Sequence, residues 1–110
     1  DLKQAKQIYK EQPFYINIKA STVYDNIEPE NDENILVQGV IDLFYINKND
    51  EIVLVDFKTD YIDDGQEIML IEKYKKQLEI YKIALEQSLK RSVSKVALYS
   101  LYLNKLIDMG

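Results

Sequence analysis

Two aspartates interrupt apolar, β-branched segments in which a carboxylate is hard to bury. The segments read Gly39-Val40-Ile41-Asp42-Leu43-Phe44 and Val55-Asp56-Phe57-Lys58-Thr59-Asp60. Aspartate is a poor strand former, and a buried carboxylate without a partner is costly. Asp56 and Lys58 are two residues apart, so on a strand they point to the same face. The pattern therefore requires a fold that gathers charged side chains at the end of a strand.

The composition narrows the chemistry that the chain can carry. Its 110 residues fit one domain, and no apolar run approaches the ~20 residues of a membrane span. We therefore expect no membrane association and a cytoplasmic location. Cysteine and histidine are absent, which excludes disulfides, thiolate zinc sites, iron–sulfur clusters and histidine acid–base catalysis within this chain. Carboxylates remain, and these favour oxygen-loving cations.

The charge balance argues against a free-standing nucleic-acid binder. The net charge is -5 and the isoelectric point about 4.7, whereas nucleic-acid binders carry a basic face. The chain also begins at Asp1 rather than at Met. We therefore expect residues 1–110 to be a single domain and a fragment of a larger protein that supplies a basic track.

Hydrophobic periodicity predicts an α/β domain with the order α-β-β-β-α-β. The expected helices are Leu2–Lys10, stopped by Pro13, and Glu67–Lys90, with an apolar face at Ile71, Tyr74, Leu78, Tyr81 and Leu85. The expected strands are Phe14–Ala20, Ile35–Ile46, Glu51–Lys58 and Ser92–Leu103. A short turn at residues 47–50 makes the second and third strands an antiparallel hairpin. The long helix should cross over to a parallel fourth strand, which gives a mixed sheet.

The two aspartates can be interpreted without any catalytic role. Asp42 could be a solvent-exposed acid of an edge strand, but strict alternation places it on one face with the apolar Val40 and Phe44. Asp56 and Lys58 alone favour a structural ion pair worth ~0–1 kcal/mol. Asp42 on the neighbouring hairpin strand changes the balance, because two adjacent carboxylates repel unless a cation lies between them.

These residue types suit phosphodiester hydrolysis. That reaction needs a water activated at neutral pH and neutralisation of the charge on the phosphate oxygens, and a magnesium ion with oxygen ligands supplies both. A lysine near the phosphate adds positive charge or orients the water. We therefore interpret the chain as the core of a metal-dependent nuclease.

Gln77 and Tyr81 are four residues apart and are neighbours on the long helix. For Tyr81 alone, an ordinary boundary between core and solvent is the simpler interpretation. A functional role for Gln77 is favoured only because the other motifs accompany it in the sequence.

Three motifs in this order resemble the RecB-type branch of the PD-(D/E)XK nuclease superfamily. They are Gly39-Val40-Ile41-Asp42, Val55-Asp56-Phe57-Lys58-Thr59-Asp60 and Tyr74-Lys75-Lys76-Gln77-Leu78-Glu79-Ile80-Tyr81. Two further segments resemble the nuclease domains of AddAB-type helicase/nucleases of double-strand-break repair: Glu11-Gln12-Pro13-Phe14 and Val96-Ala97-Leu98-Tyr99-Ser100-Leu101. The resemblance implies a restriction-endonuclease-like fold with a central mixed sheet flanked by helices.

The resemblance also implies roles for individual residues. Asp42, Asp56 and the backbone carbonyl of Phe57 would be ligands of Mg²⁺, with Mn²⁺ as a substitute. Lys58 would be the catalytic lysine.

Gln77 and Tyr81 would form the supporting Gln-x-x-x-Tyr motif of this branch. The expected partners are DNA, delivered as a single strand by a helicase motor, and an AddB-type subunit. ATP would act only in the helicase part of the parent protein. The family also uses an upstream histidine that this chain lacks, so we expect the chain alone to be a poor nuclease. Two alternatives stay open, a catalytically silent domain that docks DNA or a partner, and a small structural domain.

Overall fold

The computed structural model describes residues 5–109. Its elements in chain order are β1 Gln7–Lys19, α1 Ala20–Val23, the 3₁₀ turn η2 Pro29–Asn31, β2 Asn34–Ile46, β3 Ile52–Lys58, α2 Glu67–Leu89, β4 Lys95–Ser100 and β5 Lys105–Asp108. The strands form one mixed sheet in the order β1-β2-β3-β4-β5, in which β3 and β4 are parallel and the other neighbours antiparallel. The α/β fold class expected from the sequence is confirmed.

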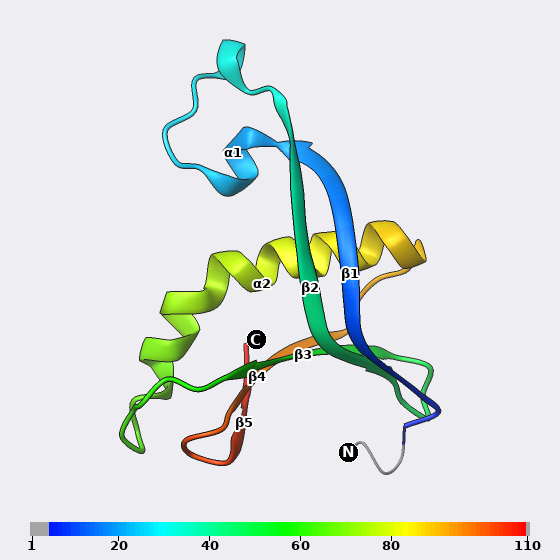
Figure 1. Cartoon of the computed structure of the whole chain (residues 1–110), viewed down its shortest axis with the longest axis vertical. Helices are drawn as coiled ribbons and strands as arrows, with labels where there is room; N and C mark the ends of the chain where they lie inside the picture. Colours follow the sequence, from blue (N-terminus) through cyan, green and yellow to red (C-terminus); the bar gives the residue numbers. More distant parts are fainter. Residues whose placement is uncertain (1–4, 110) are drawn as a thin grey trace.

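The first two strands are longer than their neighbours and bend sharply. β1 pairs with β2 along nearly their whole length, but β2 pairs with β3 only from Leu43 to Ile46. Figure 1 shows the remaining part of the β1–β2 hairpin rising away from β3 and β4 as an arm. The bend coincides with Glu11 and Asp42, the one opposed pair missing from an otherwise continuous register. Glu11 has a φ of 51°, in the left-handed region that non-glycine residues rarely occupy.

Both strands change faces at this bend. In β2, Ile41 belongs to the main core, and so does Phe44, three residues later. Strict alternation would place these two side chains on opposite faces. The expectation that Val40, Asp42 and Phe44 share an apolar face is therefore wrong, because the bend at Asp42 interrupts the alternation: Val40 is exposed and Phe44 is buried.

Helix α2 lies across the arm and the sheet and fills the angle between them (Figure 1). Its buried side chains, Leu70, Leu78, Ile80, Ala84 and Leu85, recur at helical spacing, as the sequence predicts. They join two core clusters, one with the arm and β3, the other with β4 and β5. The helix thereby presents its middle turns to the end of β3.

Two parts of the chain differ from the expectation. The predicted helix Leu2–Lys10 is wrong over Gln7–Lys10, which belong to β1; Leu2 lies outside the described residues. Backbone pairing with β2 outweighs the helical periodicity of this segment, and Pro13 lies within the strand opposite Val40. The predicted strand Ser92–Leu103 is shorter, and a turn follows it that leads to β5.

The other elements agree with the prediction. The hairpin of β2 and β3, the long helix and the parallel pairing of β3 with β4 are confirmed. Within residues 5–109 no helix is long and apolar enough to cross a membrane.

Candidate active site

Asp42 lies where β2 leaves the sheet, and its side chain reaches β3. The regular pairing of the two strands ends at Leu43 and Val55. Beyond that point, Oδ2 of Asp42 accepts a hydrogen bond of 2.9 Å from the backbone N–H of Phe57. The carboxylate therefore replaces the backbone as the partner of β3, which places it beside Asp56.

Asp56 is the most deeply buried acid that the structure describes, with 3% of its surface exposed. Burial raises its pKa to about 6, and the carboxyl of Asp42 acts in the same direction, while the ammonium of Lys58 opposes the rise. Nζ of Lys58 lies 2.7 Å from Oδ2 of Asp56, yet this buried oxygen accepts no hydrogen bond from any described residue. The two carboxylates thus repel each other, and additional positive charge beside them would reduce this repulsion.

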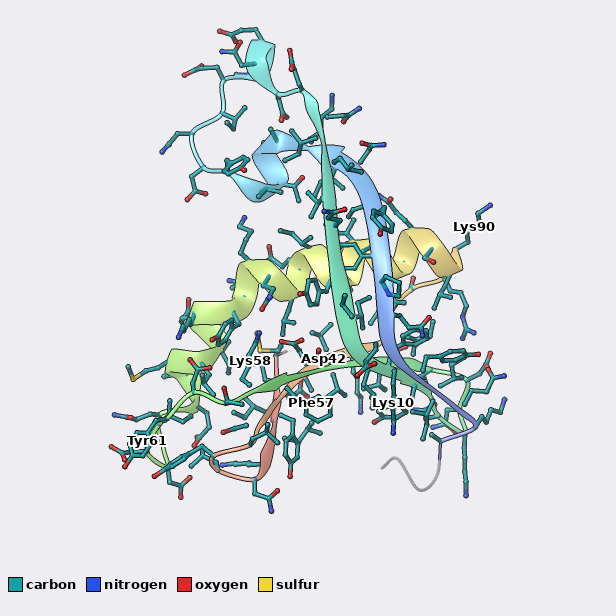
Figure 2. All side chains as sticks on the ribbon, in the orientation of Figure 1. Lys10, Asp42, Phe57, Lys58, Tyr61 and Lys90 are labelled. Atoms are coloured by element: carbon teal, nitrogen blue, oxygen red, sulfur yellow. The ribbon has the colours of Figure 1, made fainter. Side chains whose placement is uncertain are left out.

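Lys58 is enclosed by groups from β3 and α2. Its side chain is 14% exposed. Besides the contact with Asp56, Nζ donates a hydrogen bond of 2.7 Å to Oε1 of Gln77 and lies 4.0 Å from the ring centre of Tyr74. These contacts fix the ammonium at the end of β3, next to the carboxylate of Asp56. Figure 2 shows Lys58 and Asp42 near β3 on the side of the strand that faces α2, and Phe57 on the other side.

The Gln77 amide is held in turn by Tyr81. Nε2 of Gln77 donates to the Tyr81 hydroxyl at 3.2 Å, so Oε1 is free to face Lys58. The ring of Tyr81 packs edge-on against Phe14 at 5.3 Å. Burial, helped by the negative charge of Asp56, raises the pKa of Tyr81, so its hydroxyl stays protonated at neutral pH.

Gly39 provides the space for this packing. A Cβ atom at this position would lie 2.9 Å from two atoms of the Phe14 ring and 3.7 Å from the Tyr81 ring. The glycine of the first motif therefore acts through sterics: its missing side chain lets Phe14 lie flat across β2 and support Tyr81.

A surface hollow of about 410 Å³ opens beside Asp42, lined by Lys10, Glu11, Asp42, Leu43 and Phe57. It offers a substrate access to the Asp42 side of the site. A smaller hollow of about 230 Å³ lies between the arm and the end of α2, but no carboxylate lines it. Among the described hollows, the one at Asp42 is therefore the one suited to a cation and a phosphate.

The donor set suits a hard divalent cation. The carboxylates of Asp42 and Asp56 and the carbonyl of Phe57 are oxygen donors, which Mg²⁺ and Mn²⁺ prefer. The buried oxygen Oδ2 of Asp56 has only the ion pair with Lys58, while the carboxyl of Asp42 acts against its ionisation, and a cation between the carboxyls would offset that repulsion. Residues 5–109 contain no cluster of three acidic, histidine or cysteine side chains that could hold a metal. A cation would therefore depend on water or substrate oxygens for its other ligands.

The structure brings together all six residues expected at the site. One hydrogen bond joins Asp42 to Phe57, and the ion pair and hydrogen bonds given above join Asp56, Lys58, Gln77 and Tyr81. The interaction between the carboxyls of Asp42 and Asp56 links the two groups. Sequence reasoning misses the contact of Tyr74 with Lys58 and the place of Lys10 in the lining of the hollow. The helical pattern places Tyr74 on the apolar face of the long helix and Lys10 in a helix, so neither is expected beside charged groups.

A family model described as "PD-(D/E)XK nuclease superfamily" matches residues 2–107. Among the similar proteins are three ATP-dependent helicase/nuclease subunits from clostridia. That of Clostridium perfringens (strain SM101 / Type A) is 40% identical over 98% of the chain, and that of Clostridium acetobutylicum 41% over 96%. That of Clostridium beijerinckii is 44% identical over 96%. The chain spans only 8 to 9% of the length of these relatives.

The family match covers nearly the whole chain and includes the bent hairpin, the strand with Asp56 and Lys58, and the helix with Gln77 and Tyr81. Nucleases of this superfamily generally use divalent metal ions, which agrees with the oxygen donors found here. The chain therefore belongs to the PD-(D/E)XK nuclease superfamily.

Proposed function

We propose that this chain is the nuclease domain of a longer ATP-dependent helicase/nuclease and that it hydrolyses DNA phosphodiester bonds with Mg²⁺, or with Mn²⁺ as a substitute. The observation that carries the proposal is the convergence of Asp42, Asp56 and Lys58 at the end of β3. The relatives named as helicase/nuclease subunits support it.

Each residue has a distinct task in this proposal. Asp42, Asp56 and the Phe57 carbonyl would hold the cation. Lys58 places a positive charge near the scissile phosphate, where it counts most in the transition state. Gln77 directs the ammonium of Lys58, and Tyr81 directs Gln77. When bound, Mg²⁺ would supply Lewis-acid charge to the phosphate and lower the pKa of a water.

Other parts of the longer protein would supply the functions that this domain lacks. The net charge of -5 repels DNA at long range, so a basic channel would come from elsewhere. We propose that a helicase motor delivers a single strand, that ATP acts only there, and that the partner is of the AddB type. The location would be the bacterial cytoplasm, and the role double-strand-break repair and recombination.

The full-length helicase/nuclease that carries this domain, assembled with its partner protein, provides the test. Lys58→Ala and Asp42→Ala should abolish cleavage of single-stranded DNA in Mg²⁺ while ATP hydrolysis and unwinding continue. Lys48→Ala is the matched control, because Lys48 is an exposed lysine in the β2–β3 turn, at the other end of β3. Cleavage that persists in both site variants would favour a silent docking domain.

A further inference from the structure

The ammonium of Lys58 rests against an aromatic ring that the proposed chemistry does not itself use. Nζ lies 4.0 Å from the ring centre of Tyr74. A cation over the face of a tyrosine ring is attracted by the negative charge of that face. Tyr74 and Gln77 are three residues apart on α2, so the helix presents the ring and the amide to Lys58 on one face.

Tyr74 is fixed at its far end by a carboxylate from the loop after β3. Its hydroxyl donates to both oxygens of Asp60, at 2.8 and 3.0 Å. Asp60 also forms an ion pair of 2.6 Å with Lys73, the residue before Tyr74. The hydrogen bonds from Lys73 and Tyr74 hold the pKa of Asp60 below its usual range, so it remains an acceptor at neutral pH.

The contacts form a closed loop between strand and helix. Lys58 and Asp60 are two residues apart in the chain, and both contact Tyr74, one through its ring and the other through its hydroxyl. A lysine side chain has several rotatable bonds, and holding its ammonium in one place costs conformational entropy. A ring that cannot move reduces the number of positions open to that ammonium.

We propose that Tyr74 and Asp60 are positioning residues for DNA cleavage: the ring of Tyr74, held by Asp60, keeps the Lys58 ammonium between Asp56 and Gln77. This inference rests on the proposed nuclease function. The rival interpretation is a tie between the loop and α2 that stabilises the fold without affecting Lys58.

Four substitutions separate the ring from its support. Tyr74→Phe keeps the ring and removes the hydroxyl, whereas Tyr74→Leu removes the ring. Asp60→Asn keeps an acceptor for the Tyr74 hydroxyl, whereas Asp60→Ala removes this acceptor. Because Asp60 lies in a loop, Asp60→Ala should leave the core undisturbed. Tyr24→Leu is the matched control, since Tyr24 is an exposed tyrosine beyond α1.

The direct readout is the NMR signal of the Lys58 ε-methylene group in the chain with ¹³C-labelled lysine. The Tyr74 ring should shift this signal to low frequency, and its absence in Lys58→Met assigns it. Tyr74→Leu should return the shift to that of a free lysine. Asp60→Ala and Tyr74→Phe both break the hydrogen bonds that hold the ring, so each should move the shift partway, whereas Asp60→Asn and Tyr24→Leu should largely retain it. A Lys58 signal that stays in place in both Tyr74→Leu and Asp60→Ala would overturn the proposal. If Tyr74→Leu fails to fold, an unchanged Lys58 signal in Asp60→Ala would overturn the proposal by itself.

Cleavage by the full-length protein tests the consequence. At saturating single-stranded DNA and Mg²⁺, Tyr74→Leu should lower the single-turnover rate by about ten-fold or more while the apparent affinity for DNA changes little. Tyr74→Phe, which keeps the ring but removes its hydrogen bonds to Asp60, should lower the rate less than Tyr74→Leu does. If Tyr74→Leu changed the chemical shift of the Lys58 ε-methylene group but left the cleavage rate unchanged, the positioning role would be overturned. If Lys58→Met also cleaved normally, the proposed function itself would fail, whereas the NMR result would stand.

Discussion

The backbone N–H of Phe57 donates its hydrogen bond to the side chain of Asp42, at 2.9 Å, instead of to a backbone carbonyl of β2. β2 has bent away from the sheet at this point, so the carboxylate continues the contact that the backbone can no longer make. One residue thus serves both the fold and the proposed site. Its two roles can be separated by substitution.

Asp42→Asn should retain the fold and lose the cation. The amide oxygen can still accept from Phe57, so we expect the free energy of unfolding to change by less than about 1 kcal/mol, whereas Asp42→Ala should cost about 1 kcal/mol more. Urea unfolding of the metal-free chain measures both. Equal losses for Asn and Ala would mean that the charge of Asp42, and not its acceptor oxygen, supports the bend.

Asp56 should make the stability of the metal-free chain depend on pH. Its pKa is about 6 in the folded chain against an ordinary value of 3.8, so the folded state binds this proton more tightly than the unfolded state. The stabilisation is complete below about pH 4 and is lost as the pH rises through about 6. Other acids titrate in the same range, so the comparison with Asp56→Asn isolates this group.

Unfolding of the wild-type chain and of Asp56→Asn in EDTA, from pH 4 to pH 8, checks this prediction. The stability of the wild type relative to the variant should fall between pH 4 and pH 6 and then level off. A relative stability that rises with pH would show that the ion pair with Lys58 outweighs burial and the repulsion from Asp42.

Gly39→Ala should destabilise the fold and disturb Tyr81. The added Cβ meets the Phe14 ring at 2.9 Å, and overpacking of this kind typically costs about 1–3 kcal/mol. Val40→Ala, at an exposed neighbouring position, should change stability by no more than about 0.5 kcal/mol. Thermal unfolding compares the two. Equal stability of Gly39→Ala and the wild type would mean that the Phe14 ring moves aside freely.

The chain alone should bind single-stranded DNA weakly. Acidic residues outnumber basic ones, 19 to 14, and binding to phosphates depends on lysine and arginine. Fluorescence anisotropy with a labelled oligonucleotide should show no saturation in the micromolar range at 0.15 M salt. Tight binding there would show that the domain has a basic track of its own.

The placement of the candidate residues on β3 and α2 could be predicted better than the segment that leads into them. Asp56, Lys58, Gln77 and Tyr81 could be placed because strand and helix periodicity fix their directions, and both elements are long and regular. Phe57, between two of them, follows from the same strand. The site geometry therefore needed only that β3 and α2 pack together.

The bend in the hairpin could not be predicted in the same way. Periodicity over residues 2–10 favours a helix, but pairing of Gln7–Lys10 with β2 decides the outcome. The face change at Glu11 and Asp42 depends on that non-local pairing and on the left-handed backbone of Glu11. No local sequence pattern predicts this backbone conformation. The contact of Tyr74 with Lys58 escapes prediction because the tyrosine fits a core face equally well.

The central claim is that Asp42, Asp56 and Phe57 together bind a divalent cation, and paramagnetic NMR with Mn²⁺ tests it most directly. Broadening of the amide signals of the chain should centre on Asp42, Asp56 and Phe57 at low Mn²⁺ concentration, and Asp56→Asn should abolish it. Broadening that centres instead on the exposed acids Asp63 and Asp64, and that is the same in the wild type and in Asp56→Asn, would contradict the claim.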